Sequence, residues 1–411
     1  MKKNCGFPNP FKPGEFGLAG PTSLSLYDSR WASNKGVAEL VLAGKYDHLT
    51  PIFSEFIPTL RCPFHCPTCH FKKPKEDAGI WQGRPVPGCC PEMSLKQACV
   101  YLNKLAEGGC QAILLTGGGE PTLHPQLGQI VKHIKSLGLS ISMSTNGTFA
   151  GGDFEPEETI EFGFTNIRIS LDTIEKHASF HGYDKSQVDW CEIVLENIGR
   201  IAKVKKDAET RLTICIIFDQ RNFQELTGLG HRIATFKGVN SIIIRPVIDY
   251  FGNNQVSEDI IKIVERSVEE LRPALAASGL AVFFPRYRQI SLGGARRQYS
   301  ECRACGLIGG IWPDGRMFIC TETNGFDDFC IGDLTSQTLK EIYSSSRYQQ
   351  VRQKVGQDCF AQCPATCRPL TLNLIFDRIE KFRSGAEPGQ LEEWVRALQH
   401  QHIKPCPWIQ A

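Results

Sequence analysis

The sequence predicts an α/β protein, in which a partial (β/α)6 barrel is followed by a small cysteine-rich domain. Short apolar stretches alternate with helical stretches between residues 51 and 290. Strands that are apolar throughout are typical of a parallel sheet covered on both faces. Beyond residue 290 the alternation ends, and residues 300–370 carry seven cysteines. A doubly wound sheet would show the same alternation, but a cysteine loop after the first strand favours the barrel.

The elements of the barrel follow one another in a regular order. Ser94 is a good N-cap for the first helix, and Gly108 and Gly138 end the first two helices. Functional residues of such folds gather at the carboxyl ends of the strands, which is where the distinctive motifs of this chain fall. Strands are expected at Pro51–Leu60, Cys110–Thr116, Leu139–Ser144, Asn166–Leu171, Arg211–Phe218, Ser241–Ile244 and Leu280–Phe284. Helices are expected at Ser94–Glu107, Gln126–Leu137, Glu157–Phe162, Val188–Lys206, Phe223–Phe236 and Glu258–Ser278.

Four regions follow from these patterns. They are an N-terminal extension (residues 1–50), the barrel (51–290), the cysteine-rich domain (291–370) and a C-terminal helical tail (371–411). The extension shows one weak helical pattern near Val37–Leu42, and the tail shows a helix at Gln390–His400.

Composition excludes several classes of protein. The net charge of +2 provides no strong attraction to nucleic acid or to a membrane surface. No apolar run approaches the roughly 20 residues of a membrane span, and the N-terminus lacks the apolar core of a secretory signal. We therefore expect a cytoplasmic protein. In that reducing compartment the 18 cysteines are expected to include metal ligands rather than to form a disulfide framework.

The first cysteine group follows the first predicted strand. Cys62, Cys66 and Cys69 have C-x3-C-x2-C spacing, which gives an incomplete metal site. A [4Fe–4S] cluster bound by three thiolates keeps one iron without a protein ligand, open to a substrate or cofactor. A structural zinc ion takes four protein ligands, and His65, His70 or a distant cysteine would complete that alternative.

Polar and glycine-rich motifs end the strands that follow. Gly117–Pro121 (GGGEP) comes after the second strand, where glycines allow close backbone approach and a glutamate accepts hydrogen bonds from an ammonium group. Ser144–Thr148 (STNGT) ends the third strand, and Ile169–Asp172 (ISLD) ends the fourth. Arg245 ends the sixth strand.

Taken in this order, the cysteines and the strand-end motifs resemble the radical S-adenosylmethionine (SAM) superfamily. The resemblance implies that Cys62, Cys66 and Cys69 hold a [4Fe–4S] cluster, whose open iron binds the methionine moiety of SAM. The residue before the third cysteine is often aromatic in this family but is Thr68 here, so Phe64 or Phe71 is expected to pack against adenine. The further cofactor contacts that the resemblance implies are Gly118, Gly119, Glu120, Ser144, Asn146, Ser170, Asp172 and Arg245.

The second domain resembles the SPASM/twitch extension of the same superfamily. Cys302 and Cys305 precede a G-x4-C element, Gly315–Cys320, on a hairpin whose Asp-Gly turn is a strong hairpin signal. The resemblance implies an auxiliary [4Fe–4S] cluster. The last cysteine group is shorter than the family pattern, which leaves a second cluster and a zinc ribbon as alternatives. The ligands implied for one cluster are Cys302, Cys305, Cys320 and Cys367, and a second would use Cys359 and Cys363 with Cys330 or Cys406.

The resemblance implies a radical SAM oxidoreductase or maturase. Such an enzyme reductively cleaves SAM to a 5′-deoxyadenosyl radical, which abstracts a hydrogen atom from the substrate, and its electron comes from a donor such as flavodoxin or ferredoxin. The auxiliary cluster would accept an electron from substrate, relay electrons inward or bind substrate. Cys191, Cys215 and Tyr183 are candidate hydrogen or proton donors.

The expected substrate is a peptide or protein side chain, the commonest use of this extension. The N-terminal extension is too short for a peptide-recognition domain, which keeps a small molecule such as an aminocyclitol, sugar or nucleoside as an alternative, with dehydrogenation or epimerisation as the outcome. A non-enzymatic zinc or iron–sulfur protein is the third alternative.

Overall fold

The structure, a computed structural model, describes a large part of the chain. Cys359, Cys363, Cys367, Cys406 and the helix predicted at Gln390–His400 lie outside the described residues. The described residues are 31, 34–72, 80–81, 84–85, 91–151, 154–205, 209–247, 256–284, 299, 301–355 and 369–385.

One ten-stranded sheet runs through this part of the chain, in the order β12-β11-β10-β1-β4-β5-β6-β7-β8-β9. The eight strands β10, β1, β4, β5, β6, β7, β8 and β9 pair in parallel with their neighbours in this order, whereas β11 pairs antiparallel with both β10 and β12. The strands are β1 (Phe53–Phe56), β4 (Ala112–Leu115), β5 (Ser140–Thr145), β6 (Asn166–Ser170), β7 (Arg211–Phe218), β8 (Ser241–Pro246), β9 (Ala281–Phe283), β10 (Ile308–Ile311), β11 (Arg316–Phe318) and β12 (Cys330–Asp333), and β2 (Ile80–Trp81) pairs with β3 (Arg84–Pro85).

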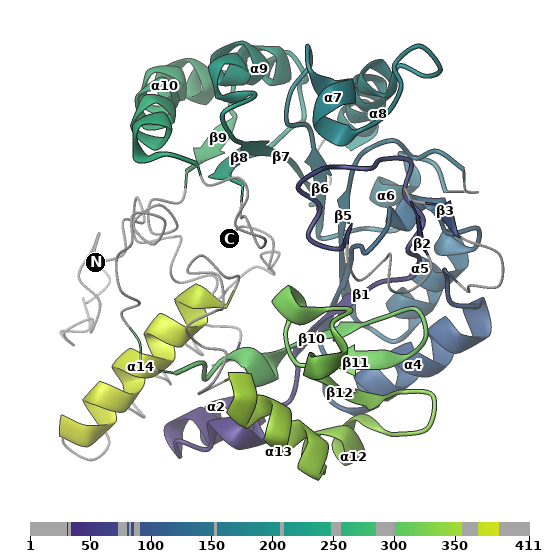
Figure 1. Ribbon diagram of the computed structural model, residues 1–411, viewed down its shortest axis with the longest axis vertical. Coiled ribbons are helices and arrows are strands. Elements are labelled where there is room, and N and C mark those ends of the chain that lie inside the picture. Colours follow the sequence, from purple (N-terminus) through teal and green to yellow (C-terminus); the bar gives the residue numbers. More distant parts are fainter. Residues whose placement is uncertain are drawn as a thin grey trace, which may run out of the picture.

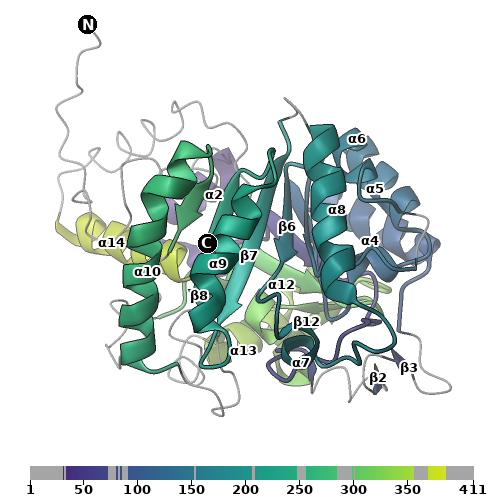
Figure 2. The ribbon, with the colours of Figure 1, turned by 90° about the horizontal axis from the view of Figure 1, so that it is seen from above.

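Helices follow the outer side of the curved sheet (Figure 1). From another direction, α8, α9 and α10 are seen to cover one face of the sheet (Figure 2). This arrangement confirms the predicted partial barrel, with every predicted barrel strand and helix present at its expected place. The helices are α2 (Lys35–Leu42), α4 (Leu95–Glu107), α5 (Leu127–Ser136), α6 (Glu158–Glu161), α7 (His177–His181), α8 (Trp190–Lys205), α9 (Leu226–Ala234), α10 (Glu258–Ala277), α12 (Leu339–Ser344), α13 (Ser346–Gln353) and α14 (Leu370–Gly385).

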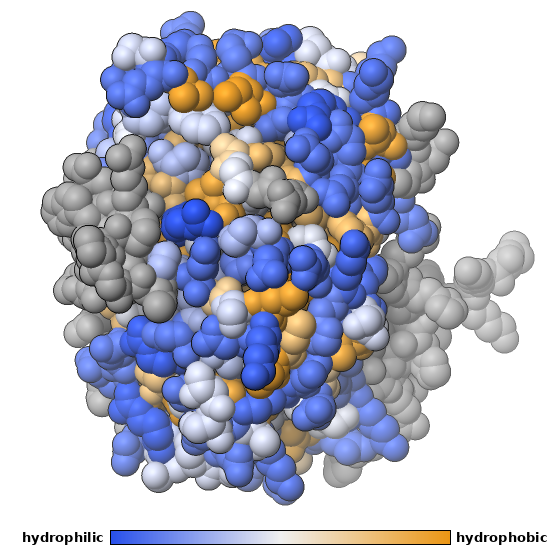
Figure 3. Space-filling model, turned by 90° about the vertical axis from the view of Figure 1, so that its right-hand side faces the viewer, coloured by the Kyte–Doolittle hydropathy of each residue, from blue (hydrophilic) through white to orange (hydrophobic). Residues whose placement is uncertain are grey.

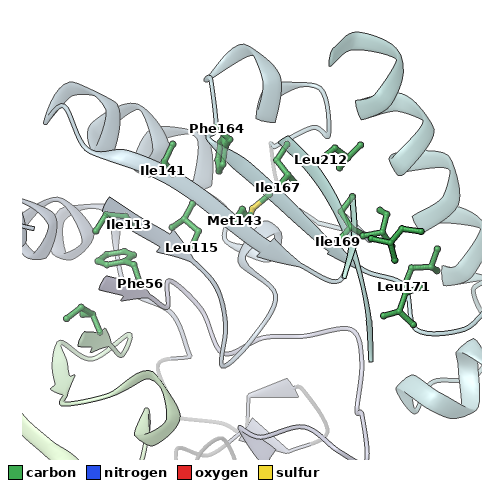
Figure 4. Close-up of a cluster of buried hydrophobic side chains, with 14 of the residues drawn as sticks. Phe56, Ile113, Leu115, Ile141, Met143, Phe164, Ile167, Ile169, Leu171 and Leu212 are labelled. Atoms are coloured by element: carbon green, nitrogen blue, oxygen red, sulfur yellow. The ribbon is translucent and has the colours of Figure 1, made fainter. Parts of the chain in front are cut away.

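The two faces of the sheet differ in chemistry. Side chains alternate along a strand, and Ile113, Ile141 and Ile167 join the large core beneath the outer helices (Figure 4). The opposite, inner face is polar in its middle. There Arg168 donates to Ser144 Oγ, from Nε at 3.0 Å and Nη2 at 2.7 Å. The sequence analysis expected strands that are apolar throughout, and the polar Ser144 and Arg168 on the inner face show that this expectation is wrong for β5 and β6.

A second core brings the two ends of the described chain together. Trp31 packs edge-on against Phe376 of α14, with ring centroids 5.5 Å apart. These side chains join α2 and the inner-facing Phe53 and Leu114 in one hydrophobic cluster. The weak helical pattern of the N-terminal extension thus becomes α2, which packs with α14 against β1 and β4.

The cysteine-rich region continues the barrel sheet. Strand β10 pairs with β1, and Glu55 lies opposite Gly310 in their register. Asn324, from the loop after β11, donates from Nδ2 to Glu55 Oε2 at 2.9 Å and occupies the space beside Gly310. Lys104 of α4 also donates to the carbonyls of Leu334 and Gln337. The predicted domain boundary at residue 290 stays a prediction, but the strands on its two sides share one sheet.

Hydrophobic side chains are scattered over the outer surface. Figure 3 shows a mainly hydrophilic face on which hydrophobic residues form small, separate groups. Among the described residues, the exposed large hydrophobic side chains are Val100, Val204 and Ile263, each on a different helix. No helix in this part of the chain combines the length and the apolar character that crossing a membrane requires.

We predict that Gly310→Ala destabilises the junction between β1 and β10. A Cβ at this position would lie 1.7 Å from Asn324 Oδ1, and Asn324 is fully buried and held by Glu55. Overpacking of this kind costs about 1–3 kcal/mol, measured as a lower midpoint of chemical unfolding. Gly228→Ala is the matched control: its Cβ meets nothing within 4 Å on α9, and helix propensity predicts up to about 1 kcal/mol of stabilisation. Equal midpoints for the two variants would contradict this account of the junction.

Candidate functional site

The first cysteine loop lies directly after β1, at the carboxyl end of the sheet. Cys62, Cys66 and Cys69 are partly exposed, and the Cys69 N–H donates to the Cys66 carbonyl at 3.1 Å. The glycine-rich turn after β4 packs on the start of this loop: Glu120 N–H donates to the Arg61 carbonyl at 2.7 Å. A Cβ on Gly119 would lie 2.3 Å from that same carbonyl oxygen. Gly119 is thus required for the turn to reach the loop.

Helix α7 holds the other side of the loop. His181 Nδ1 lies 3.3 Å from Cys66 Sγ, and the His65 N–H donates to the His181 carbonyl at 2.9 Å. Gly182 has φ of +69°, and a Cβ there would lie 2.3 Å from the His65 carbonyl oxygen. Sequence reasoning missed His181, because a five-residue helix is too short to give a periodic signal.

Aromatic rings bury the centre of the loop. Phe64 is only 3% exposed, and its ring stacks on His181 and Tyr183, with centroids at 4.9 Å and 5.4 Å. Phe71 is also buried and packs on Trp312, with centroids 6.2 Å apart. Both phenylalanines therefore anchor the loop to the protein, and the adenine contact assigned to them stays a prediction.

Glu120 connects the ends of β4 and β5. Its carboxylate is buried and accepts hydrogen bonds from Thr122 N–H (3.1 Å), the Thr122 hydroxyl (2.8 Å), the Thr145 hydroxyl (2.6 Å) and Asn146 N–H (2.7 Å). Burial raises the pKa of Glu120, while these donors favour its ionised form. Within the described residues Glu120 therefore orients the β5 turn, and its predicted contact with an ammonium group stays a prediction.

The turn after β5 reaches the first cysteine. Asn146 Nδ2 lies 3.9 Å from Cys62 Sγ, and its Oδ1 accepts from Thr148 N–H at 3.0 Å. Ser144, one of the predicted cofactor contacts, is held from the neighbouring strand by Arg168. Sequence reasoning missed Arg168 as a site residue. A basic residue within a strand is ordinarily expected to face solvent, and the curvature that turns this face inward cannot be recognised from the strand alone.

The ends of β6 and β8 complete this side of the site. Asp172 is buried, its Oδ1 accepts from Ile217 N–H at 2.5 Å, and its Oδ2 lies 3.5 Å from His181 Nε2. Burial raises the pKa of Asp172 to about 7, against the Ile217 hydrogen bond and the charge of Arg245. Burial likewise lowers the pKa of His181 well below its usual value. Ser170 and Arg245 are partly exposed at their strand ends.

The candidate hydrogen or proton donors have different surroundings. Cys191 lies in the core beneath the outer helices, away from the inner face, and burial raises its pKa to about 11. Cys215 is buried on β7 opposite Ser170, on the inner-face side of the strand. Burial also raises the pKa of Tyr183 to about 12, and its hydroxyl lies 2.8 Å from His177 Nδ1. Their roles in a reaction stay predictions.

The second cysteine site lies at the amino end of β10. Cys305 is fully buried and Cys320 is 7% exposed. Arg352 Nη1 donates to Cys305 Sγ at 3.3 Å, and Asn373 Nδ2 donates to Cys302 Sγ at 3.3 Å. The hydrogen bond from Cys305, then the Asn373 amide and the Arg352 charge, lower the pKa of Cys302, whereas the same Cys302–Cys305 hydrogen bond and burial raise the pKa of Cys305. Sulfur atoms that receive hydrogen bonds from an amide and a guanidinium suit thiolate ligands.

Both cysteine groups provide donors of the kind that bind iron–sulfur clusters. Within the described ranges, no three His, Cys, Asp or Glu side chains converge on a point where one metal ion would sit. Zinc needs its ligands about 2.0–2.3 Å from a single centre, whereas the thiolates of a [4Fe–4S] cluster bind different irons. The donors themselves, Cys62, Cys66 and Cys69 in one group and Cys302, Cys305 and Cys320 in the other, are of the type that a [4Fe–4S] cluster takes, and their assignment as ligands stays a prediction.

Comparison with known families identifies the chain. Residues 56–229 match the radical SAM superfamily, and residues 309–368 match SPASM, an iron–sulfur cluster-binding domain. The chain belongs to the radical SAM superfamily. Its cofactors are accordingly SAM, the [4Fe–4S] cluster that binds it, and auxiliary iron–sulfur clusters in the SPASM domain.

Two characterised relatives share parts of this radical SAM chain. A tungsten-containing aldehyde ferredoxin oxidoreductase cofactor-modifying protein from Pyrococcus furiosus is 21% identical over 254 residues, which are 58% of this chain and 69% of the relative. PqqA peptide cyclase from Bradyrhizobium diazoefficiens is 24% identical over 170 residues, 41% of this chain and 39% of the relative. The fold resembles that of Streptococcus suis SuiB bound to its precursor peptide SuiA, with a TM-score of 0.55, 14% identity, and 81% and 73% of the two chains covered.

We predict that Glu120→Gln loosens the turns around the first cysteine loop. The amide would replace one acceptor oxygen by an NH2 group facing the donors of Thr145, Thr122 or Asn146. An unsatisfied buried donor costs about 1–3 kcal/mol, measured by chemical unfolding. Glu161→Gln, on the exposed end of α6, is the matched control and should change stability by no more than about 0.5 kcal/mol. A Glu120→Gln protein as stable as the control would refute this role.

Proposed function

We propose that this radical SAM protein is an oxidoreductase that modifies a side chain of a peptide or protein. The observation that carries the proposal is the meeting of three strand ends at the cysteine triad. The loop after β1 provides the cysteines, the turn after β5 brings Asn146 to Cys62, and α7, which follows β6, brings His181 to Cys66. The peptide cyclase and the peptide-bound SuiB structure support a peptide as substrate.

When bound, the triad cluster and SAM supply a 5′-deoxyadenosyl radical that abstracts a hydrogen atom from the substrate. The residues of this chain bind, orient and shield these groups. A ligating thiolate accepts hydrogen bonds but does not donate them, so the contact with Cys66 places the His181 proton on Nδ1. Asn146 directs an amide N–H at Cys62 in the same way. Glu120 fixes that turn through the Asn146 N–H.

The inner face of the sheet suits a polar ligand. Ser142, Ser144 and Arg168 line its middle, and Arg168 provides a cation close to the predicted cofactor contacts. Phe64 and its stacked rings seal the outer side of the cysteine loop. This arrangement shields the site from water on one side and leaves the partly exposed thiols accessible on the other. The electron for SAM cleavage comes from an external donor such as flavodoxin or ferredoxin.

A second candidate is modification of a small molecule. Of the two relatives described above, the one that matches the larger part of this chain is a cofactor-modifying protein rather than a peptide cyclase. The polar inner face, with Arg168 at its centre, accommodates a small polar substrate as readily as a peptide side chain.

We predict that the anaerobically purified protein forms 5′-deoxyadenosine from SAM under a strong reductant. Incubation with short peptides encoded beside its gene should yield a product lighter by two hydrogen atoms or cross-linked, as detected by mass spectrometry. The triple variant Cys62→Ala, Cys66→Ala, Cys69→Ala should form no deoxyadenosine, because no cluster binds SAM. Cys99→Ala, a partly buried cysteine of α4, is the matched control and should retain activity.

The result separates the candidates. Turnover of an aminocyclitol, sugar or nucleoside, with all peptides left unchanged, would replace the peptide proposal by the small-molecule one. Absence of deoxyadenosine from a protein that contains its full iron would contradict both.

A further inference from the structure

We propose that Arg352 raises the reduction potential of the auxiliary cluster. A raised potential favours accepting an electron from the substrate over the other two roles considered for this cluster, relaying electrons inward and binding substrate. The inference rests on the proposed function, because it takes Cys302, Cys305 and Cys320 as ligands of that cluster. Arg352 does not touch substrate or SAM; it acts through a ligand sulfur and is a positioning residue.

Helix α13 delivers Arg352 to the cysteines. Ser345 caps the helix by accepting from Tyr348 N–H at 3.1 Å, and the Tyr348 hydroxyl lies 3.4 Å from the Leu49 carbonyl oxygen. Tyr348 is fully buried. Arg352 follows four residues later on the same face of the helix, which directs its guanidinium to Cys305 Sγ at 3.3 Å.

The charge of Arg352 is directed mainly at sulfur. In the described part of the chain no carboxylate forms an ion pair with this guanidinium, whereas Lys354, two residues on, pairs with Asp328 at 2.7 Å at the surface. Cys305, the partner of Arg352, is fully buried. A cation beside a buried sulfur acts more strongly than one in water, because the surrounding dielectric constant is lower.

A second donor acts in the same direction. Asn373 of α14 donates from Nδ2 to Cys302 Sγ at 3.3 Å. Its Oδ1 accepts from Arg303 N–H at 2.7 Å and Ala304 N–H at 2.9 Å, which fixes the cysteine turn. Reduction adds one negative charge to a cluster, so positive charge and hydrogen bonds at its sulfur ligands stabilise the reduced form and raise the potential.

The test is a redox titration of the auxiliary cluster in the full-length holoenzyme, followed by EPR. The auxiliary signal is the one that persists when Cys62, Cys66 and Cys69 are replaced by Ala. Arg352→Gln should lower the midpoint potential by at least the 59 mV that corresponds to a tenfold change in the equilibrium constant of a one-electron couple. Arg352→Lys, which keeps the charge, should stay closer to wild type. Lys354→Gln is the matched control, because it removes a nearby charge that is paired at the surface, and it should not shift the potential.

Asn373→Asp provides an independent variant if Arg352→Gln fails to take up iron. The carboxylate keeps an acceptor for the two backbone N–H groups, removes the donor to Cys302 and adds a negative charge, so it should lower the potential as well. Unchanged potentials in variants with full iron would overturn the proposal. A purely structural role for Arg352 predicts that the variants lose iron while the clusters that remain keep the wild-type midpoint potential, and this result would also overturn the proposal. A wild-type protein without auxiliary iron would instead contradict the proposed function.

Discussion

The pairing of β1 with β10 is the interaction on which the rest of the structure depends. Strand β1 leads into the loop of Cys62, Cys66 and Cys69 at its carboxyl end, and β10 follows Cys302 and Cys305 at its amino end. Because the two strands are parallel and in register from Phe53 to Phe56, they set the separation of the two cysteine sites. The register also requires Gly310, since Asn324 occupies the space beside it and bonds to Glu55.

The two sites differ in ways that match different tasks. The thiols of the first triad are partly exposed and receive contacts from neutral groups, the His181 imidazole and the Asn146 amide. In the second site, Cys305 is fully buried and receives a guanidinium. Partly exposed thiols suit a cluster that is predicted to admit SAM, and a positively polarised site with Cys305 and Cys320 buried suits one that is predicted to exchange electrons. The helices packed on each site therefore determine which charged or neutral groups contact its cysteines: α7 at the first site, and α13 and α14 at the second.

Much of this arrangement could be predicted from the sequence, because it depends on local patterns. The strands are short apolar stretches between helices, and the motifs with Glu120, Asn146 and Asp172 fall at their ends. Three features could not be predicted in this way. The contact between His181 and Cys66 joins residues 115 positions apart, and the β1–β10 pairing joins strands 255 positions apart, as for Ser54 and Gly309. The polar inner face with Arg168 follows from sheet curvature, which no single strand encodes.

The central claim is that Cys62, Cys66 and Cys69 hold a cluster with one iron open to SAM. The most direct test is the EPR spectrum of the reduced protein, in which Cys302, Cys305 and Cys320 are replaced by Ala, recorded before and after addition of SAM. The account predicts that the signal of the remaining cluster changes its g-values when SAM is added, because the methionine moiety coordinates the open iron. A cluster signal that SAM leaves unchanged, in protein that retains its iron, would contradict it.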